Sequence, residues 1–318
     1  MTTTAFVFPG QGSQRPGMGT SFYDAWPETR ERLDALSSSL GEDLADLCFD
    51  GDAASLRETR NTQPALFSVG LATLAGLRAR TDGRPDYVAG HSLGHFTALA
   101  AAGALEPAAG VSLVRQRGRL LAEAGRQAGP GTMLAVLLAD PEEVAATCAD
   151  RDDVGVGLYN GPRQTVISGT REGVDAVRAD LEATTCARFR ELEVATAFHS
   201  PVMEPAREAV DEVMADVALE PADVPVVSDV SGRIYTDPDV ARQDLAEQVT
   251  APVDWHGVVE TLRERDVDRY VVFPPAGALA SLVERIAPDA EVLALAEPGD
   301  VAALESEGTG VEVRGEDG

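Results

Sequence analysis

Residues 90–94 (Gly-His-Ser-Leu-Gly) have the pattern of a nucleophile elbow, with Ser92 at its centre. The apolar-rich run 85–89 predicts a short buried strand before them, and the run 97–105 predicts a helix after them. In that setting the glycines allow a sharp turn that exposes the serine hydroxyl, and the helix start offers backbone N–H groups to a developing oxyanion. The pattern also occurs by chance, but between a strand and a helix it indicates a serine nucleophile.

A serine nucleophile needs a general base, and the chain has 4 histidines. His91 adjoins Ser92 and should point away from it, while His95 suits a surface or supporting position and His256 a structural one. His199 is the strongest candidate because it lies where a predicted small domain returns to the large one, and clefts between domains commonly hold sites. A lone histidine before a helix would equally suit a position beside a helix cap.

The elements around these residues alternate between strand and helix, which predicts an α/β fold. A first strand, 5–8, leads into the glycine-containing loop 9–14, which matches neither a P-loop nor a dinucleotide fingerprint. Asp237 is expected to cap the helix that follows it. The other predicted elements of the large domain are helices at 21–58, 65–77, 107–125, 201–218, 238–249, 252–265 and 278–286 and strands at 224–230 and 269–273.

Residues 131–196 predict a unit of their own. Their strands (132–138, 154–159, 164–168 and 187–194) and helices (141–150 and 171–183) follow the order βαββαβ, which is ferredoxin-like. We therefore expect this small domain to be inserted into a discontinuous large domain of residues 1–130 and 197–298. Residues 299–318 are acidic and free of aromatics, which predicts a disordered tail.

The composition narrows the class of partner. The 318 residues include 53 acidic and 26 basic ones, a formal net charge of -27, and there is no lysine. Such a surface repels nucleic acid and anionic membranes, so both are poor partners. The many carboxylates indicate either a surface that keeps the protein soluble or an adaptation to a salty cytoplasm. The N-terminus lacks signal-peptide features, no apolar run could span a bilayer, and the three cysteines lack metal-site spacing. We expect a cytoplasmic protein without a metal site.

Six motifs, taken in order, resemble those of the malonyl-CoA:acyl-carrier-protein transacylases and the acyltransferase domains of polyketide synthases. They lie within residues 5–290 and are Phe8–Gln14, Gln63–Leu66, Gly90–Gly94, Arg117–Gly118, Asn160–Gln164 and Phe198–Met203. The resemblance implies an α/β-hydrolase-like large domain with a ferredoxin-like insert, in agreement with the predicted elements.

The resemblance also implies roles for the catalytic residues. Ser92 would be the nucleophile and His199 the general base, with the backbone N–H groups of Gln11 and Leu93 forming the oxyanion hole. The family completes no triad with a carboxylate. A backbone carbonyl orients the histidine instead, and Gln248 matches the residue that supplies it.

The same resemblance assigns four residues to the substrate. Arg117 matches the arginine that grips the malonyl carboxylate, a task suited to a guanidinium fork. From the residues alone, a surface arginine beside Arg115 and Arg119 is the favoured interpretation. Gln63 and Asn160 would be polar supports of the pocket, and Phe198 matches the phenylalanine of polyketide acyltransferases that choose malonyl.

The implied reaction is malonyl transfer from malonyl-CoA to the phosphopantetheine thiol of an acyl carrier protein, by a monomer that needs no bound cofactor. A serine hydrolase, a transferase for another extender unit and a non-catalytic docking subunit remain as alternatives. Three departures from the family pattern bear on the choice of extender unit and carrier protein: His95-Phe96 after the elbow, Thr196, and residues 272–276.

Overall fold

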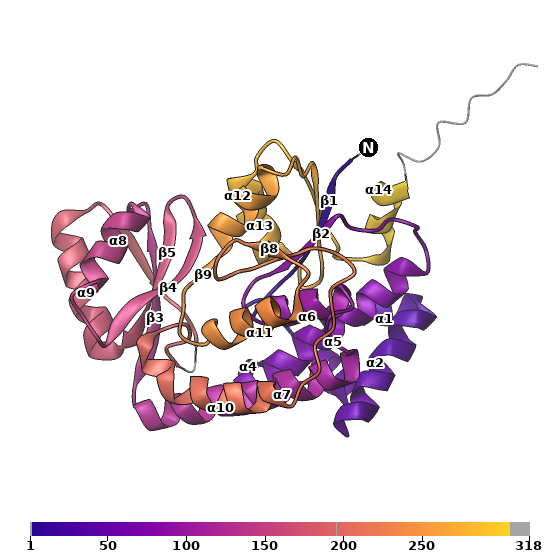
Figure 1. Cartoon of the computed structure of the whole chain (residues 1–318), viewed down its shortest axis with the longest axis horizontal. Helices are drawn as coiled ribbons and strands as arrows, with labels where there is room; N and C mark the ends of the chain where they lie inside the picture. Colours follow the sequence, from indigo (N-terminus) through magenta and orange to yellow (C-terminus); the bar gives the residue numbers. More distant parts are fainter. Residues whose placement is uncertain (1, 195, 306–318) are drawn as a thin grey trace, which may run out of the picture.

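The computed structural model describes residues 2–194 and 196–305, which contain a six-stranded and a five-stranded sheet (Figure 1). The larger sheet has the order β11-β10-β1-β2-β7-β8, and its pairs are parallel except β7–β8. Its strands are β1 (Thr4–Phe8), β2 (Tyr87–Gly90), β7 (Val226–Val227), β8 (Ile234–Tyr235), β10 (Arg269–Val272) and β11 (Glu291–Ala294). The parallel arrangement brings the carboxyl ends of β1, β2 and β7 to one edge.

Helices cover both faces of this sheet, as a parallel sheet requires. Phe6 and Phe8 pack on one face against buried side chains of α1 (Thr20–Ala25), α2 (Pro27–Leu40), α5 (Thr59–Arg78), α6 (Leu93–Ala101), α7 (Pro107–Ala128), α10 (Glu204–Ala215) and α11 (Pro238–Glu247). Ala5 and Val7 pack on the other face against α12 (Trp255–Arg263) and α13 (Gly277–Ile286). Alternate residues of β1 therefore point into two separate cores.

The five-stranded sheet has the order β6-β3-β5-β4-β9. Its strands are β3 (Gly131–Leu137), β4 (Val154–Gly161), β5 (Gln164–Thr170), β6 (Arg188–Glu191) and β9 (Val253–Asp254). Helices α8 (Pro141–Cys148) and α9 (Arg171–Thr184) cover its outer face (Figure 1). The predicted fold class is confirmed, including the βαββαβ order; the domain boundaries stay a prediction, and β9, from the returning part of the chain, pairs with β4.

The expectation of one helical stretch over 21–58 is wrong. The segment forms α1, α2, α3 (Leu44–Phe49) and α4 (Ala53–Arg57). Pro27 starts α2, Gly41 ends it in a left-handed conformation, and the side chains of Asp43 and Asp52 cap the two helices that follow. Each break has a local chemical signal.

Helix α5 begins at Thr59 rather than near Pro64, which lies inside it. A proline inside a helix leaves the carbonyl four residues earlier without its N–H donor. That carbonyl belongs to Arg60, and it accepts a hydrogen bond of 2.5 Å from Nη1 of Arg115 on α7. A contact between two helices thus replaces the missing bond, so the helix can start earlier than the proline indicates.

The prediction of a disordered tail from residue 299 needs correction for residues 299–305. A 3-10 turn (Pro298–Val301) and α14 (Ala302–Glu305) form here, with Val301 buried and Asp300 closing a capping box with Glu297. Residues 306–318 lie outside the described residues. The described helices include none long and apolar enough to cross a membrane.

Candidate active site

Ser92 lies between β2 and α6, in the strand–turn–helix setting predicted for it. Its φ of 53° is left-handed, as is the 55° of His199, and such backbone in a non-glycine residue costs about 1–3 kcal/mol. The turn needs its glycines: a Cβ on Gly90 would overlap the backbone of Gly94, and one on Gly94 would overlap the carbonyl of Phe8. The elbow therefore packs directly against the end of β1.

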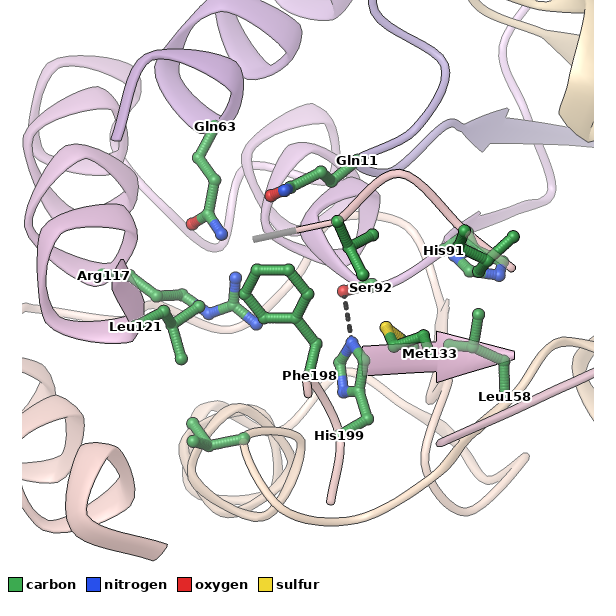
Figure 2. Close-up of a pocket in the computed structure, with 13 residues that line it drawn as sticks. Gln11, Gln63, His91, Ser92, Arg117, Leu121, Met133, Leu158, Phe198 and His199 are labelled. Carbon is green, nitrogen blue, oxygen red and sulfur yellow. Dashed lines mark hydrogen bonds between the residues drawn. The ribbon is translucent and has the colours of Figure 1, made fainter. Parts of the chain in front are cut away.

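The Ser92 hydroxyl meets the imidazole of His199 across 107 residues of sequence. The distance from Ser92 Oγ to His199 Nε2 is 2.8 Å, and His199 Nδ1 lies 2.7 Å from the backbone oxygen of Gln248 (Figure 2). A carbonyl oxygen only accepts, so Nδ1 carries the proton and Nε2 is left to accept from the serine. The arrangement is one that a serine nucleophile and an oriented general base require.

The environment of His199 keeps its imidazole neutral. Burial lowers the pKa of His199 to about 3, and the positive charge of Arg117 acts in the same direction, while the hydrogen bond to Gln248 opposes them. A neutral imidazole is the form that takes a proton from a hydroxyl. At neutral pH His199 is therefore in the form that a general base requires.

Arg117 is buried in the same pocket. One guanidinium nitrogen donates to Oε1 of Gln248 at 2.9 Å, the guanidinium carbon lies 5.0 Å from the centre of the Phe96 ring, and Nε has no hydrogen-bond partner among the described residues. Burial lowers its pKa only to about 10, so the group stays charged. Its neighbour Arg115 pairs with Glu42 instead, which leaves Arg117 as the arginine facing the pocket.

The pocket beside Ser92 has both polar and apolar lining. Gln63 on α5 and Gln11 after β1 extend toward it, and Oε1 of Gln63 is buried with no partner in the described part of the chain (Figure 2). Gln11 Nε2 lies 3.3 Å from Thr59 Oγ1. The apolar lining consists of Leu121, Met133, Leu158, Leu192, Val194, Phe198 and Val249.

Three predicted residues lie outside this lining: Gln248, whose contacts are given above, Asn160 and Leu93. Asn160 stands behind the elbow, where its Oδ1 is 2.8 Å from His91 Nε2, so it supports the turn rather than the cavity wall. Leu93 is fully buried as the first residue of α6. Its backbone N–H is one of the helix-start donors that have no partner within the helix, so it is available to an oxyanion.

Asp229, a site residue not predicted from the sequence, is fully buried beside the elbow. Its Oδ2 accepts from the Ser92 backbone N–H at 2.7 Å, and both oxygens lie 2.9 Å from Nε2 of Gln248. A signal was present, because Asp229 follows β7, the neighbour of β2 in a parallel sheet. His95 is likewise buried, and its Nε2 pairs with the Tyr235 hydroxyl at 2.7 Å rather than lying at the surface.

Known proteins resemble this chain in both sequence and fold. The family model described as "Acyl transferase domain" matches residues 5–303. A malonyl CoA-acyl carrier protein transacylase of Bacillus subtilis is 36% identical over 302 residues, covering 94% of this chain and 95% of the relative. The structure of a malonyl-CoA:acyl carrier protein transacylase from Xanthomonas oryzae superposes with a TM-score of 0.91 at 36% identity, covering 96% and 98% of the two chains.

A second solved structure includes a partner. It is a malonyl-transacylase in complex with a type II polyketide synthase acyl-carrier protein, and it superposes with a TM-score of 0.90 at 30% identity, covering 96% of this chain and 100% of that one. Near-complete coverage in both directions means that the whole architecture is shared. The chain belongs to the acyl transferase family that includes the malonyl-CoA–acyl carrier protein transacylases.

Proposed function

We propose that the protein moves a malonyl group from malonyl-CoA to the phosphopantetheine thiol of an acyl carrier protein, for fatty acid or polyketide synthesis. The observation that carries this proposal is the pairing of a Ser92–His199 couple with a buried, charged Arg117 in one pocket. A serine and a histidine suffice for acyl transfer in general. The buried arginine adds a reason for an acyl chain that bears a carboxylate.

In the first half-reaction, His199 Nε2 takes the hydroxyl proton of Ser92 while Oγ attacks the thioester carbonyl. The N–H groups of Gln11 and Leu93 stabilise the resulting oxyanion, which collapses and breaks the C–S bond. The coenzyme A thiolate leaves and takes the proton from His199. In the second half-reaction the carrier thiol gives its proton to His199, its sulfur attacks the acyl-serine, and Ser92 leaves and recovers the proton.

Arg117 is suited to hold the malonyl carboxylate. Its Nε is buried without a partner, and the nearby Oε1 of Gln63 is also unpartnered among the described residues. Hydrogen bonds to charged groups contribute roughly 1.5–3 kcal/mol, and an unpaired buried charge costs more. A malonyl carboxylate would satisfy the guanidinium, whereas an acetyl group would not.

A groove next to the pocket is suited to the phosphates of both substrates. It shares Gln11, Leu192 and Val194 with the pocket. Its lining includes three arginines (Arg15, Arg57 and Arg190) and two glutamates (Glu191 and Glu193), and Glu193 pairs with Arg57. Coenzyme A and the phosphopantetheine arm both carry phosphate, which guanidinium groups bind well. The groove therefore supports a substrate that enters as a phosphopantetheine thioester.

The proposal includes action in the cytoplasm, as a monomer without a resident cofactor. Support for a monomer without a cofactor comes from the composition of the site, because one chain supplies every protein group that the two half-reactions use. The proton moves only between Ser92, His199 and the thiols. A second subunit or a redox group has no step to perform in this scheme.

The test is intact-protein mass spectrometry after mixing with malonyl-CoA, followed by peptide mapping. We expect a malonyl adduct on Ser92 that disappears when carrier protein is added, and no adduct on Ser92→Ala. An adduct that persists on Ser92→Ala would overturn the nucleophile assignment. Release of malonate to water at the rate of transfer to carrier protein would instead identify a hydrolase, and the absence of any adduct would favour a docking subunit.

A further inference from the structure

The sequence and the proposed mechanism leave Asp229 without a role, although it lies at the centre of the site. It is fully buried after β7, and its own backbone oxygen accepts from Asp254 N at 2.7 Å, which anchors it between the two sheets. A buried carboxylate is costly unless it is hydrogen-bonded and near a positive charge. Its contacts therefore indicate why it is there.

The carboxylate joins two parts of the site that are far apart in sequence. Asp229 Oδ2 accepts from the Ser92 N–H at 2.7 Å, and this bond stabilises the left-handed backbone conformation of Ser92. Both carboxylate oxygens lie 2.9 Å from Gln248 Nε2, which also donates to the Ser92 backbone oxygen at 3.1 Å. The nucleophile turn and Gln248 are thus fixed to each other.

Gln248 in turn forms hydrogen bonds with both His199 and Arg117. Its backbone oxygen accepts from Nδ1 of His199, and its side-chain oxygen accepts from Arg117. Since Asp229 occupies the amide nitrogen of Gln248, the amide oxygen must face Arg117. One carboxylate therefore fixes which end of the amide the arginine meets.

We propose that Asp229 is a positioning residue, which acts through Gln248 and the Ser92 N–H to align nucleophile, base and substrate arginine. It touches neither the base nor the acyl group. The proposal rests on the acyl transfer proposed above, but it concerns geometry and not the identity of the acyl acceptor. The required feature is a hydrogen-bond acceptor at Asp229 Oδ2, and its negative charge offsets that of Arg117.

The surroundings of Asp229 agree with an acceptor role. His95 Nδ1 lies 3.7 Å from Asp229 Oδ1, and the positive charge of Arg117 favours the ionised carboxylate. Burial nevertheless raises the pKa of Asp229 to about 6, against the hydrogen bonds from Gln248 and Ser92. The site thus keeps a carboxylate that desolvation disfavours, as expected when its contacts have a function.

The experiment compares Asp229→Ala, Asp229→Asn and the matched control Asp244→Ala. Asp244 is another buried carboxylate, on α11, whose side chain bonds neither Ser92 nor Gln248. The readouts are the single-turnover rate of acyl-serine formation and the ratio of malonyl to acetyl rates, both per mole of folded protein. A purely structural role would lower the folded amount and leave both readouts unchanged.

We expect Asp229→Ala to slow malonyl-serine formation about 10²-fold, the size of loss that small misplacements cause. The ratio of malonyl to acetyl rates should fall about tenfold, because the Gln248 amide that binds Arg117 is no longer held by Asp229. Asp229→Asn keeps an acceptor oxygen and should stay within about tenfold of the native rate. Asp244→Ala should retain the native rate and ratio.

A double-mutant cycle tests whether Asp229 acts through the side chain of Gln248. It uses Gln248→Ala, which keeps the backbone carbonyl that binds His199. Asp229→Ala combined with Gln248→Ala should be no slower than Asp229→Ala alone, because both act in one chain of contacts. Effects that multiply would overturn the proposal, and so would an Asp229→Asn rate a hundredfold below native. The Asn variant decides the matter even if the Ala variant does not fold. Loss of the Ser92 adduct in native protein would instead refute the transferase proposal.

Discussion

The two sheets contribute differently to the one pocket. The loops and helices on the six-stranded sheet supply most of its polar side chains: Gln11, Gln63, His91, Ser92 and Arg117. The five-stranded sheet and the segment after it supply mostly apolar ones: Met133, Leu158, Leu192, Val194 and Phe198. His199 stands where the chain passes from one region to the other.

The difference follows from the sheet geometry. Parallel strands bring several loop ends and helix starts, with their free N–H groups, to one edge. The inner face of an antiparallel sheet presents a regular row of side chains, which suits a smooth apolar wall. We therefore expect changes on the first side to alter reaction rate and charge recognition, and changes on the second to alter the shape of the acyl chain that fits.

The largest expected effect is that of His199→Ala. Removing the base leaves Ser92 with its proton, and the loss should be about 10⁴-fold or more in acyl-serine formation. Rapid-quench mass spectrometry measures this rate. The control is His256→Ala, on α12 and outside the pocket, which should react like native protein. A loss below tenfold for His199→Ala would show that another group takes the proton.

Arg117→Ala should cost about 10²-fold in malonyl transfer while acetyl transfer holds or rises. The same change should raise the pKa of His199, since the charge of Arg117 helps to lower it. The rate of the native enzyme should show no loss of the base between pH 8 and about pH 5. In Arg117→Ala the acid limb should move to higher pH.

Arg119→Ala is the matched control, because this exposed arginine lies on the same helix two residues further on. It should leave both the acyl preference and the pH profile unchanged. Equal losses with malonyl and acetyl in Arg117→Ala would make that arginine a structural residue.

A smaller change is expected on the apolar side. Phe198→Ala widens the wall next to Ser92 and should shift the methylmalonyl-to-malonyl rate ratio about tenfold toward methylmalonyl, since one methyl group contributes about 1–3 kcal/mol. Competition between the two thioesters measures the ratio. Phe189→Ala, on β6 of the five-stranded sheet and packed against the core under α8 and α9, should leave it unchanged. An unchanged ratio in Phe198→Ala would mean that this wall does not select the acyl chain.

The smallest effect concerns the surface that encloses both regions. With a net charge of -27, carboxylate repulsion is screened over about 10 Å at 0.1 M salt and about 3 Å at 1 M. The melting temperature should rise by on the order of 5 °C from dilute buffer to molar potassium chloride. Sucrose at matched osmolality controls for effects unrelated to charge. A melting temperature that stays constant or falls with salt would contradict this prediction and indicate that the acidic residues serve solubility alone.

Local signals in the sequence predicted local structure well. Asp237 caps α11 through its side chain, as expected from its place before Pro238. The errors arose where a distant residue changed a local preference, as when Arg115 bonds the carbonyl that Pro64 leaves free inside α5. Short strands such as β8 and β11 were missed because their pairing partners, β7 and β10, decide whether they form.

By itself, the sequence determined the fold class, the strand–turn–helix around Ser92 and the acidic surface. These depend on periodicity, glycine positions and charge, which act over a few residues or on the whole chain. Only the tertiary structure decided that Asp229 and Gln248 lie between Ser92, His199 and Arg117. The reason is physical: a buried hydrogen bond fixes position only when both partners are brought together, and packing of the sheets and helices brings these partners together.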